Sequence, residues 1–316
     1  MPEHLPSSSR PFDLLVAGEI NPDLILTGDV EPVFGQVEKC VDSATLTVGS
    51  SSVIFACGAA RLGLRVAFIG KCGDDLFGHY MLEAMQERGI DTRAVIRIPG
   101  GHTGVSVILN RGSDRAILTY PGLIKALAAE DIPDDLLKQA RHLHIASYFL
   151  QTALQAGLPD LFHRARRSGV TTSLDPNYDP GASWQGIRDL LPLVDVFLPN
   201  QTEACALTGM DNPAEAALSL GKQAGTVAVK MGAQGAVGVR GESLAHVPAL
   251  AVKVVDTVGA GDSFDAGFLC GFLKGWTLER CLGLGAVCGS LSTRSAGGVA
   301  AQPTLGEALA FLEPEG

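Results

Sequence analysis

The sequence has few charged residues, few aromatic residues and no long apolar segment. Charged residues make up 18% and aromatic residues 6% of the 316 positions. No apolar run approaches the roughly 18 residues that a membrane-spanning helix needs. Clusters of lysine and arginine are also absent, and acidic residues outnumber basic ones by 34 to 24. These absences argue against a membrane protein and against a nucleic-acid-binding protein.

The cysteines show no pattern of disulfides or metal ligands. Seven are present, at positions 40, 57, 72, 205, 270, 281 and 288, without a CxxC pair or a histidine at zinc spacing. We therefore expect reduced, mostly buried thiols in a cytoplasmic protein. Residues 1–12 contain serine and proline but no apolar core. They are expected to form a flexible leader and not a signal peptide.

Apolar residues and glycine are abundant. They account for 46% of the chain and for 38 positions, respectively. This composition excludes wholesale disorder and supplies a large core with many tight turns. We expect one α/β domain over residues 13–316, because α/β folds of this length often form a single domain.

Strand-like and helix-like segments alternate along much of the chain. The expected strands of the main body are 13–18, 66–70, 143–145, 171–174, 194–198 and 227–230, with a hairpin at 235–248. The expected helices are 51–63, 75–88, 150–168, 184–191, 203–207, 213–224, 260–274 and 278–292. This alternation predicts a doubly wound, mostly parallel sheet flanked by helices.

A second group of short strands differs from this pattern. They are expected at 24–27, 43–48, 95–98, 104–109 and 115–120, with tight turns between the last three. Short strands joined by tight turns are typical of antiparallel pairing. We predict a small antiparallel β lid formed by about residues 24–48 and 95–122, with a meander over its second part.

The most informative segment is DTVGAGDSF, at residues 256–264. A strand expected at 252–255 leads into small residues, and a helix begins there. The first N–H groups of a helix have no internal partner, so small residues allow an anion to approach them. Asp262 lies in that first turn. On this evidence alone, it could be a catalytic carboxylate or an ordinary helix-capping residue.

The same segment, continued by DAGF at 265–268, resembles the C-terminal motif of the ribokinase-like, or PfkB, carbohydrate kinases. Other similar segments follow the family's order: GKCGDDLFG at 70–78, DPN at 175–177, PNQTE at 199–203 and KMGAQG at 230–235. The resemblance extends over about residues 13–312. It implies a ribokinase-like α/β kinase domain with a β lid, in agreement with the pattern of segments.

The resemblance also implies catalytic and nucleotide-binding roles. Asp262 would be the base that activates the acceptor hydroxyl, and the N–H groups of Gly259, Ala260 and Gly261 would hold the transferring phosphoryl group. ATP would be the donor. The residues expected to bind the nucleotide are Asn177, Lys230, Gly232, Gly235 and Thr257.

Two cation sites are implied in the same way. Asn200 and Glu203 would position Mg²⁺, mainly through water. Without the resemblance, this pair would be interpreted as a helix N-cap and its capping glutamate. Asp256 and the carbonyl of Val258 resemble a monovalent-cation site, for which K⁺ is the candidate.

The expected sugar-binding residues follow the first strand and line the lid. Asn21 and Asp23 look like the family's substrate pair, although an Asn-Pro-Asp turn is the simpler interpretation. The other expected substrate-binding residues are Gly49, Ser50, Gly104 and Asn110. Ser50 and Ile54 replace the second glycine and the asparagine that are usual in this loop. The arginine that often follows DPN is also missing, which weakens the case for an acidic sugar.

These observations predict an ATP- and Mg²⁺-dependent kinase that phosphorylates a primary hydroxymethyl group of a sugar or sugar-like compound. A nucleoside kinase of the same family is an alternative, since Ile54 and Phe55 could face a base. A catalytically silent ligand sensor on the same fold is another. The exposed strands of the lid suggest a homodimer. No nucleic acid or membrane partner is expected.

Overall fold

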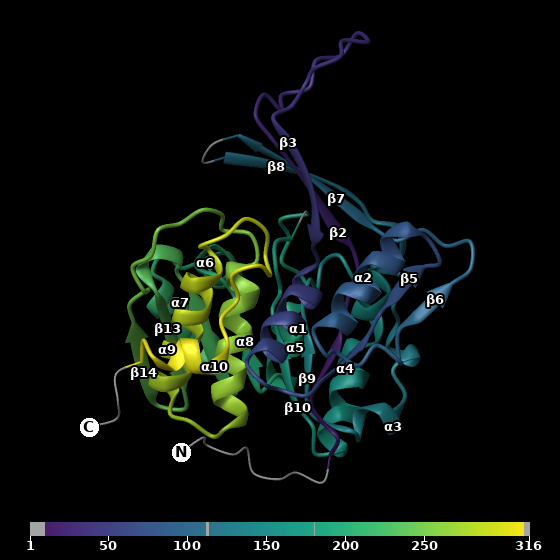
Figure 1. Cartoon of the computed structure of the whole chain (residues 1–316). Helices are drawn as coiled ribbons and strands as arrows, with labels where there is room; N and C mark the ends of the chain where they lie inside the picture. The colour runs from purple at the N-terminus through teal and green to yellow at the C-terminus, as the bar shows by residue number, and fades with distance from the viewer. Residues whose placement is uncertain (1–9, 112–113, 180, 313–316) are drawn as a thin grey trace.

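The computed structural model describes residues 10–111, 114–179 and 181–312 (Figure 1). Its centre is an eight-stranded sheet in the order β14-β13-β12-β11-β10-β9-β1-β4. The strands from β12 to β4 run parallel, and β12, β13 and β14 pair antiparallel at one edge. The bounds are β1 (Phe12–Ala17), β4 (Val66–Ile69), β9 (Ala140–Ile145), β10 (Thr171–Leu174), β11 (Val196–Phe197), β12 (Thr226–Lys230), β13 (Ala236–Arg240) and β14 (Ser243–Val247). The predicted doubly wound, mostly parallel sheet is confirmed.

Helices cover both faces of this sheet. One core cluster contains residues from α1 (Ser51–Arg61), α2 (Leu76–Glu87), α8 (Ala260–Leu273), α9 (Leu278–Ser292) and α10 (Leu305–Leu309). The other contains residues from α3 (Asp134–Leu137), α4 (Thr152–Arg167), α5 (Ile187–Leu190), α6 (Gln201–Thr208) and α7 (Pro213–Gly221). Because both faces are covered, several strands of this sheet are buried apolar runs, such as LLVA in β1 and VAFI in β4, although β9 and β10 also contain polar residues.

A small second sheet projects from the body (Figure 1). It has the order β3-β2-β7-β8, with β2 (Pro22–Thr27), β3 (Ser43–Val48), β7 (Val105–Arg111) and β8 (Asp114–Tyr120). The β2–β3 and β7–β8 pairs are antiparallel, as expected, whereas β2 and β7 run parallel at the centre. We call this four-stranded sheet the lid.

One predicted lid strand lies elsewhere. The segment expected at 95–98 is a strand, β6 (Ile96–Ile98), but it pairs in parallel with β5 (Lys71–Gly73) in a separate two-stranded sheet. The predicted antiparallel meander is therefore wrong in its first strand. A strand of three residues with alternating apolar and polar side chains cannot specify its partner strand. It buries too little apolar surface to favour one pairing register over another.

Other expected boundaries also differ. Residues 252–255 form no strand, and Val254 and Val255 are more than half exposed. The helix expected at 184–191 is reduced to α5. Phe12, placed in the expected leader, is the first residue of β1. Residues 1–9 of that leader lie outside the described residues.

The cysteines agree with the expectation of reduced, mostly buried thiols. None of the seven cysteines forms a disulfide, and those at 57, 72, 270, 281 and 288 are buried. Burial raises the pKa of Cys57 to about 12, which makes it an unreactive thiol. Within the described ranges, no helix combines the length and the apolar character that crossing a bilayer requires.

Candidate active site

The predicted site residues gather at the carboxyl ends of the parallel strands, the edge at which open α/β sheets bind ligands. Asn21 follows β1, Asn177 follows β10 and Asn200 follows β11, while Lys230 is the last residue of β12. The parallel register brings these chain segments to one edge of the sheet. The start of α8 completes the site, because Gly261 lies close to Lys230.

The start of α8 has the form of an anion site. Gly259 caps the helix in the left-handed region at φ 70°, without a side-chain hydrogen bond to the first turn. A Cβ atom at this glycine would lie 2.7 Å from the Cα of Gly298 and 2.8 Å from a methyl group of Ile54. Only glycine satisfies both the conformation and the packing. The helix therefore begins with small residues and with N–H groups that can bind an anion.

Asp262 is a buried carboxylate in this first turn, with 7% of its surface exposed. Burial raises the pKa of Asp262 well above its usual range, and the negative charges of Asp175 and Glu19 raise it further. The ammonium of Lys230 and a hydrogen bond from Ser51 lower it. A carboxylate in such surroundings accepts a proton more readily than an exposed one, which suits a general base.

A cavity of about 530 Å³ opens beside this helix end. Its size lies within the range of small-molecule sites. Six residues predicted for nucleotide or phosphoryl binding line it: Lys230, Gly232, Gly235, Thr257, Ala260 and Gly261.

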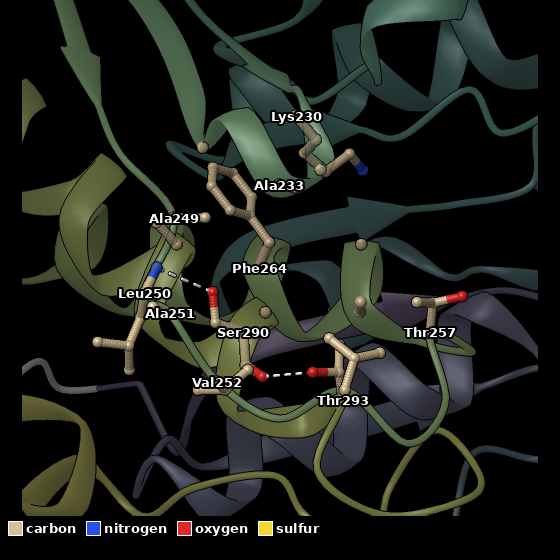
Figure 2. Close-up of a pocket in the computed structure, with 17 residues that line it drawn as sticks. Lys230, Ala233, Ala249, Leu250, Ala251, Val252, Thr257, Phe264, Ser290 and Thr293 are labelled. Carbon is tan, nitrogen blue, oxygen red and sulfur yellow. Dashed lines mark hydrogen bonds between the residues drawn. The ribbon is translucent and has the colours of Figure 1, made fainter.

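Much of the cavity wall was not predicted from the sequence. It includes the segment 249–252, Ala286 and Ser290 of α9, and Thr293 directly after that helix. Figure 2 shows Ser290 and Thr293 beside the 249–252 segment. Ser290 fastens the two walls together, because its hydroxyl accepts a hydrogen bond from the Leu250 N–H at 3.2 Å. A sequence signal was available, since Ala286, Ser290 and Thr293 are spaced as one face of a helix.

Lys230 forms a buried ion-pair network. Its ammonium lies 2.7 Å from the Asp175 carboxylate and 3.0 Å from that of Asp265. These two carboxylates raise the pKa of Lys230 against the opposing effect of burial. In Figure 2 the ammonium points away from the wall at 249–252. The side chain lines the cavity, but its charge is balanced by protein groups.

Asn200 and Glu203 form a complete capping box at the start of α6. The Asn200 N–H donates to Glu203 Oε2 at 2.8 Å, and the Glu203 N–H donates to Asn200 Oδ1 at 2.9 Å. Burial and the nearby charge of Asp175 raise the pKa of Glu203 to about 7. Among the described residues, no three acidic, histidine or cysteine side chains are grouped to hold a metal ion. A cation here would need ligands besides protein side chains.

Asp256 ties two loops together near the cavity. Its carboxylate accepts hydrogen bonds from the N–H of Val258 at 3.0 Å and from the N–H of Gly297 at 2.9 Å. Both interactions hold the chain that leads into Gly259. The structure thus gives Asp256 a role in shaping the loop, alongside the cation-binding role expected from the sequence.

Asn21 and Asp23 lie together where the chain enters the lid: Asn21 directly precedes β2 and Asp23 is the second residue of that strand. The Asn21 amide is 3.4 Å from Asp23 Oδ1 and 3.3 Å from the hydroxyl of Ser106, a residue not predicted from the sequence. Burial raises the pKa of Asp23 to about 7. A Cβ atom at Gly49 would lie 2.2 Å from Asp23 Oδ1, so this glycine makes room for the carboxylate. These residues form a polar cluster suited to sugar hydroxyls.

The two remaining lid residues are not part of this cluster. Gly104 packs against Ile124, where a Cβ atom would lie 2.6 Å from a side-chain methyl group. Asn110 pairs with Thr27, four residues along β2 from Asp23, which corresponds to about 13 Å along the strand. The structure therefore separates Asn110 from the Asn21–Asp23 pair.

The family model for pfkB family carbohydrate kinases matches residues 13–305. The chain belongs to the PfkB family. It is 34% identical over 236 residues to an uncharacterized sugar kinase of Archaeoglobus fulgidus, covering 72% of this chain and 91% of the relative. It is 32% identical over 277 residues to 2-dehydro-3-deoxygluconokinase of Bacillus subtilis, covering 82% and 85%. The structure of Arabidopsis thaliana ribokinase complexed with ribose and ATP has a TM-score of 0.83 at 22% identity, covering 96% of this chain and 99% of that one. The chain is therefore a carbohydrate kinase, a phosphotransferase with an alcohol group as acceptor.

Two side chains of this PfkB kinase point elsewhere than the sequence suggested. Ser50 is the N-cap residue of α1, and its hydroxyl donates a hydrogen bond to the Glu19 carbonyl at 2.7 Å. The only proton of this hydroxyl is therefore used within the protein. Asn177 is not among the residues that line the nucleotide cavity. Its amide donates to Ser51 at 3.1 Å, and its carbonyl accepts from the Ser147 N–H at 2.7 Å.

The side chains that favoured a nucleoside substrate are buried in the core of this kinase. Ile54 is 3% exposed and packs near Gly259 and Gly298. Phe55 is 1% exposed and stacks on His144 at 3.7 Å between ring centroids. Neither is available to face a nucleobase. The observation that supported the nucleoside alternative is thereby removed.

Proposed function

We propose that this PfkB kinase transfers the terminal phosphoryl group of ATP to a primary hydroxymethyl group of a sugar or sugar-like compound. The observation that carries the proposal is the position of Asp262. This buried carboxylate directly follows Ala260 and Gly261, which line the cavity. A proton acceptor and the N–H groups that can bind a phosphoryl group therefore lie within one helical turn.

In the proposed reaction, Asp262 takes the proton of the acceptor hydroxyl. The hydroxyl oxygen forms a bond to the γ-phosphorus, and the bond from that phosphorus to the β–γ bridging oxygen breaks, releasing ADP. The charge on the equatorial oxygens is stabilised by the N–H groups of Gly259, Ala260 and Gly261. Closure of the lid over the bound sugar would exclude water from the site.

ATP as donor is supported by the cavity and by the relative crystallised with ATP. Asn200 and Glu203 would hold Mg²⁺ through water, in a region made negative by Asp175. When bound, Mg²⁺ would neutralise phosphate charge, and it keeps several waters in most protein sites. Asp256 and the Val258 carbonyl would bind K⁺ if activity depends on a monovalent cation.

The proposal is tested by measuring ADP release from Mg-ATP over a panel of sugars, sugar acids and nucleosides. We expect turnover with a neutral sugar, because the arginine that often follows DPN in the family is missing here and Asp179 lies in that loop. Its carboxylate instead accepts hydrogen bonds from Gly181, Ser183 and Trp184. Tight binding of one compound without turnover would favour the sensor alternative. Turnover confined to nucleosides would favour the nucleoside kinase.

The nucleotide cavity can be tested separately. Ala251 is an exposed residue of its wall. In Ala251→Trp, the indole would fill space that the proposal assigns to ATP. We expect the KM for ATP to rise at least about tenfold, the effect of losing roughly 1.4 kcal/mol of binding, while the KM for the sugar stays unchanged. The matched control is Ala310→Trp, at an exposed position on the end of α10. Equal ATP kinetics in both variants would contradict the assignment.

We also propose that the lid forms a homodimer contact. Along β8, at one edge of the lid, Ile117, Leu118 and Tyr120 are each at least half exposed. An exposed strand edge with apolar side chains favours pairing with another strand. Small-angle scattering is expected to give twice the chain mass of 32.9 kDa, and Leu118→Glu should restore the monomer mass. A monomeric wild-type protein would exclude this dimer.

A further inference from the structure

A second cavity, of about 510 Å³, shares no lining residue with the nucleotide cavity. It lies between the end of α1, the end of α2 and the segment 299–302. Because Arg61 and Arg88 line it, we call it the arginine cavity. Arg61 ends α1, about 15 Å along the helix axis from the first residue of that helix, Ser51. The volume of the arginine cavity lies within the range of small-molecule sites.

The two guanidinium groups of this cavity have unused hydrogen-bond donors. Arg61 donates through Nε to the Gln302 carbonyl at 3.0 Å, and Arg88 donates through Nη1 to the Ala84 carbonyl at 2.8 Å. Within the described residues neither arginine forms an ion pair, whereas Arg65, the next arginine along the chain, does form one. A guanidinium carries five N–H donors, so most of those on Arg61 and Arg88 remain for a ligand.

Helix-end charge offers a simpler explanation of the two arginines, because a positive charge stabilises the negative end of a helix dipole. The backbone itself, however, closes most of each helix end. The Leu62 N–H at the end of α1 and the Arg88 N–H at the end of α2 each bond two carbonyls of the last turn. Stabilisation of a helix end also requires no cavity. It does not account for two such ends that line one cavity with their guanidinium groups.

The other polar side chains of the cavity offer hydrogen-bond acceptors. Glu87 is exposed, and its carboxylate forms no ion pair with any described residue. The amide nitrogen of Gln302 donates to the Ile54 carbonyl at 2.9 Å and to the Ser263 hydroxyl at 3.0 Å. Its amide oxygen accepts no hydrogen bond from the part of the chain that the structure describes. A carboxylate and an amide oxygen suit hydroxyl donors, and the carboxylate would repel a second anionic group.

We propose that the arginine cavity binds a sugar phosphate. Its phosphate would lie on Arg61 and Arg88, since guanidinium groups bind phosphate through paired N–H donors. Its hydroxyls would lie on Glu87 and Gln302, and the charge of Glu87 favours a ligand with a single anionic group. The proposal does not depend on the role of the catalytic base, because no residue of the phosphoryl-transfer site lines this cavity.

The wall of the arginine cavity also contacts the start of α8. Gln302 bonds to Ser263, which lies near the start of that helix. Gly298, which precedes the wall segment, packs against Gly259, where a Cβ atom would lie 2.7 Å from the Cα of Gly298. A ligand on Gln302 would therefore contact the segment that supports the phosphoryl-binding end of α8.

Calorimetric titration with ribose 5-phosphate, fructose 6-phosphate and glucose 6-phosphate tests the inference. A non-hydrolysable Mg-ATP analogue is kept at saturation, so that its terminal phosphate occupies the start of α8. We expect at least one of the three compounds to bind more tightly than inorganic phosphate. Arg61→Met and Arg88→Met should each weaken that binding about tenfold, the effect of losing a hydrogen bond to a charged group. Arg167→Met, at an exposed position at the end of α4, should bind as the wild type does.

A second variant fills the cavity without changing a charge. Ala300 is an exposed residue of its wall, so the indole of Ala300→Trp should abolish binding while the urea unfolding midpoint stays at the wild-type value. Ala310→Trp, at an exposed position outside the cavity, is the matched control.

Three results would refute the site. They are failure of all three compounds to bind, equal affinity for inorganic phosphate, and wild-type affinity in both arginine variants. If the ATP analogue does not bind, the proposed function loses its phosphoryl donor, whereas the comparison of variants still tests the arginine cavity.

Discussion

Asp262→Asn is expected to lower kcat by about 10²–10⁴-fold, the usual contribution of a positioned general base. The amide is similar in size to the carboxylate, so the packing at the start of α8 should survive. It cannot accept the hydroxyl proton at any accessible pH. The acceptor would then have to attack as a neutral alcohol, and the loss should appear in kcat with every substrate that the wild type phosphorylates. ADP release under saturating Mg-ATP and sugar measures it.

Binding of ATP should remain, since the cavity is lined by Ala260 and Gly261 but not by Asp262. Calorimetric titration with Mg-ATP would show whether the variant is folded and still binds the donor. The matched control is Asp211→Asn, at an exposed aspartate outside the site, which should keep wild-type turnover. Wild-type turnover in Asp262→Asn would show that another group accepts the proton.

The body of the fold could be predicted because its signals are local. Several strands of the body are apolar runs, helical patterns separate most of its strands, and right-handed crossovers then specify a parallel sheet. The partner of a short strand is not a local property. Residues 95–98 have the composition of a lid strand, yet β6 pairs with β5 in a separate two-stranded sheet.

The cavity wall shows a second limit of prediction. Three of the four residues at 252–255 are valine, which predicts a strand. In the structure, the preceding segment 249–252 faces α9 across the cavity, and the Leu250 N–H is bonded to the side chain of Ser290. The Val255 N–H, which a sheet could use, donates instead to the Thr293 carbonyl just after α9, at 2.8 Å. No pattern within the segment itself carries that information.

The role of a site residue could be predicted from the sequence only where it depends on the conformation of the local backbone. It could not be predicted where it depends on side chains that are distant in the sequence. Gly259 is required by the conformation and close packing at the start of α8, so a glycine in the motif indicates it. Lys230 is different, because its partners Asp175 and Asp265 lie 55 and 35 residues away in the sequence. A lysine in a loop motif gives no sign that its charge is neutralised by buried carboxylates.

Lys230→Met is therefore expected to destabilise the protein, lowering the free energy of unfolding by about 3–5 kcal/mol. Methionine fills a similar volume, so the main loss is the positive charge between Asp175 and Asp265. The ammonium now lowers the pKa of Asp175, and the same carboxylate would be left buried without a counter-ion. Urea unfolding at pH 7 measures the change, with Lys222→Met, an exposed lysine after α7, as the control expected within about 0.5 kcal/mol of wild type.

The double variant Lys230→Met, Asp175→Asn distinguishes a lost ion pair from lost packing. Removing the charge of Asp175 relieves the unpaired carboxylate, so the double variant should be more stable than Lys230→Met alone. Its coupling energy should exceed about 1 kcal/mol, as for residues in direct contact. If the two changes were simply additive, the network would contribute little. Lys230 would then be free to act on the nucleotide, and its loss should instead raise the KM for ATP.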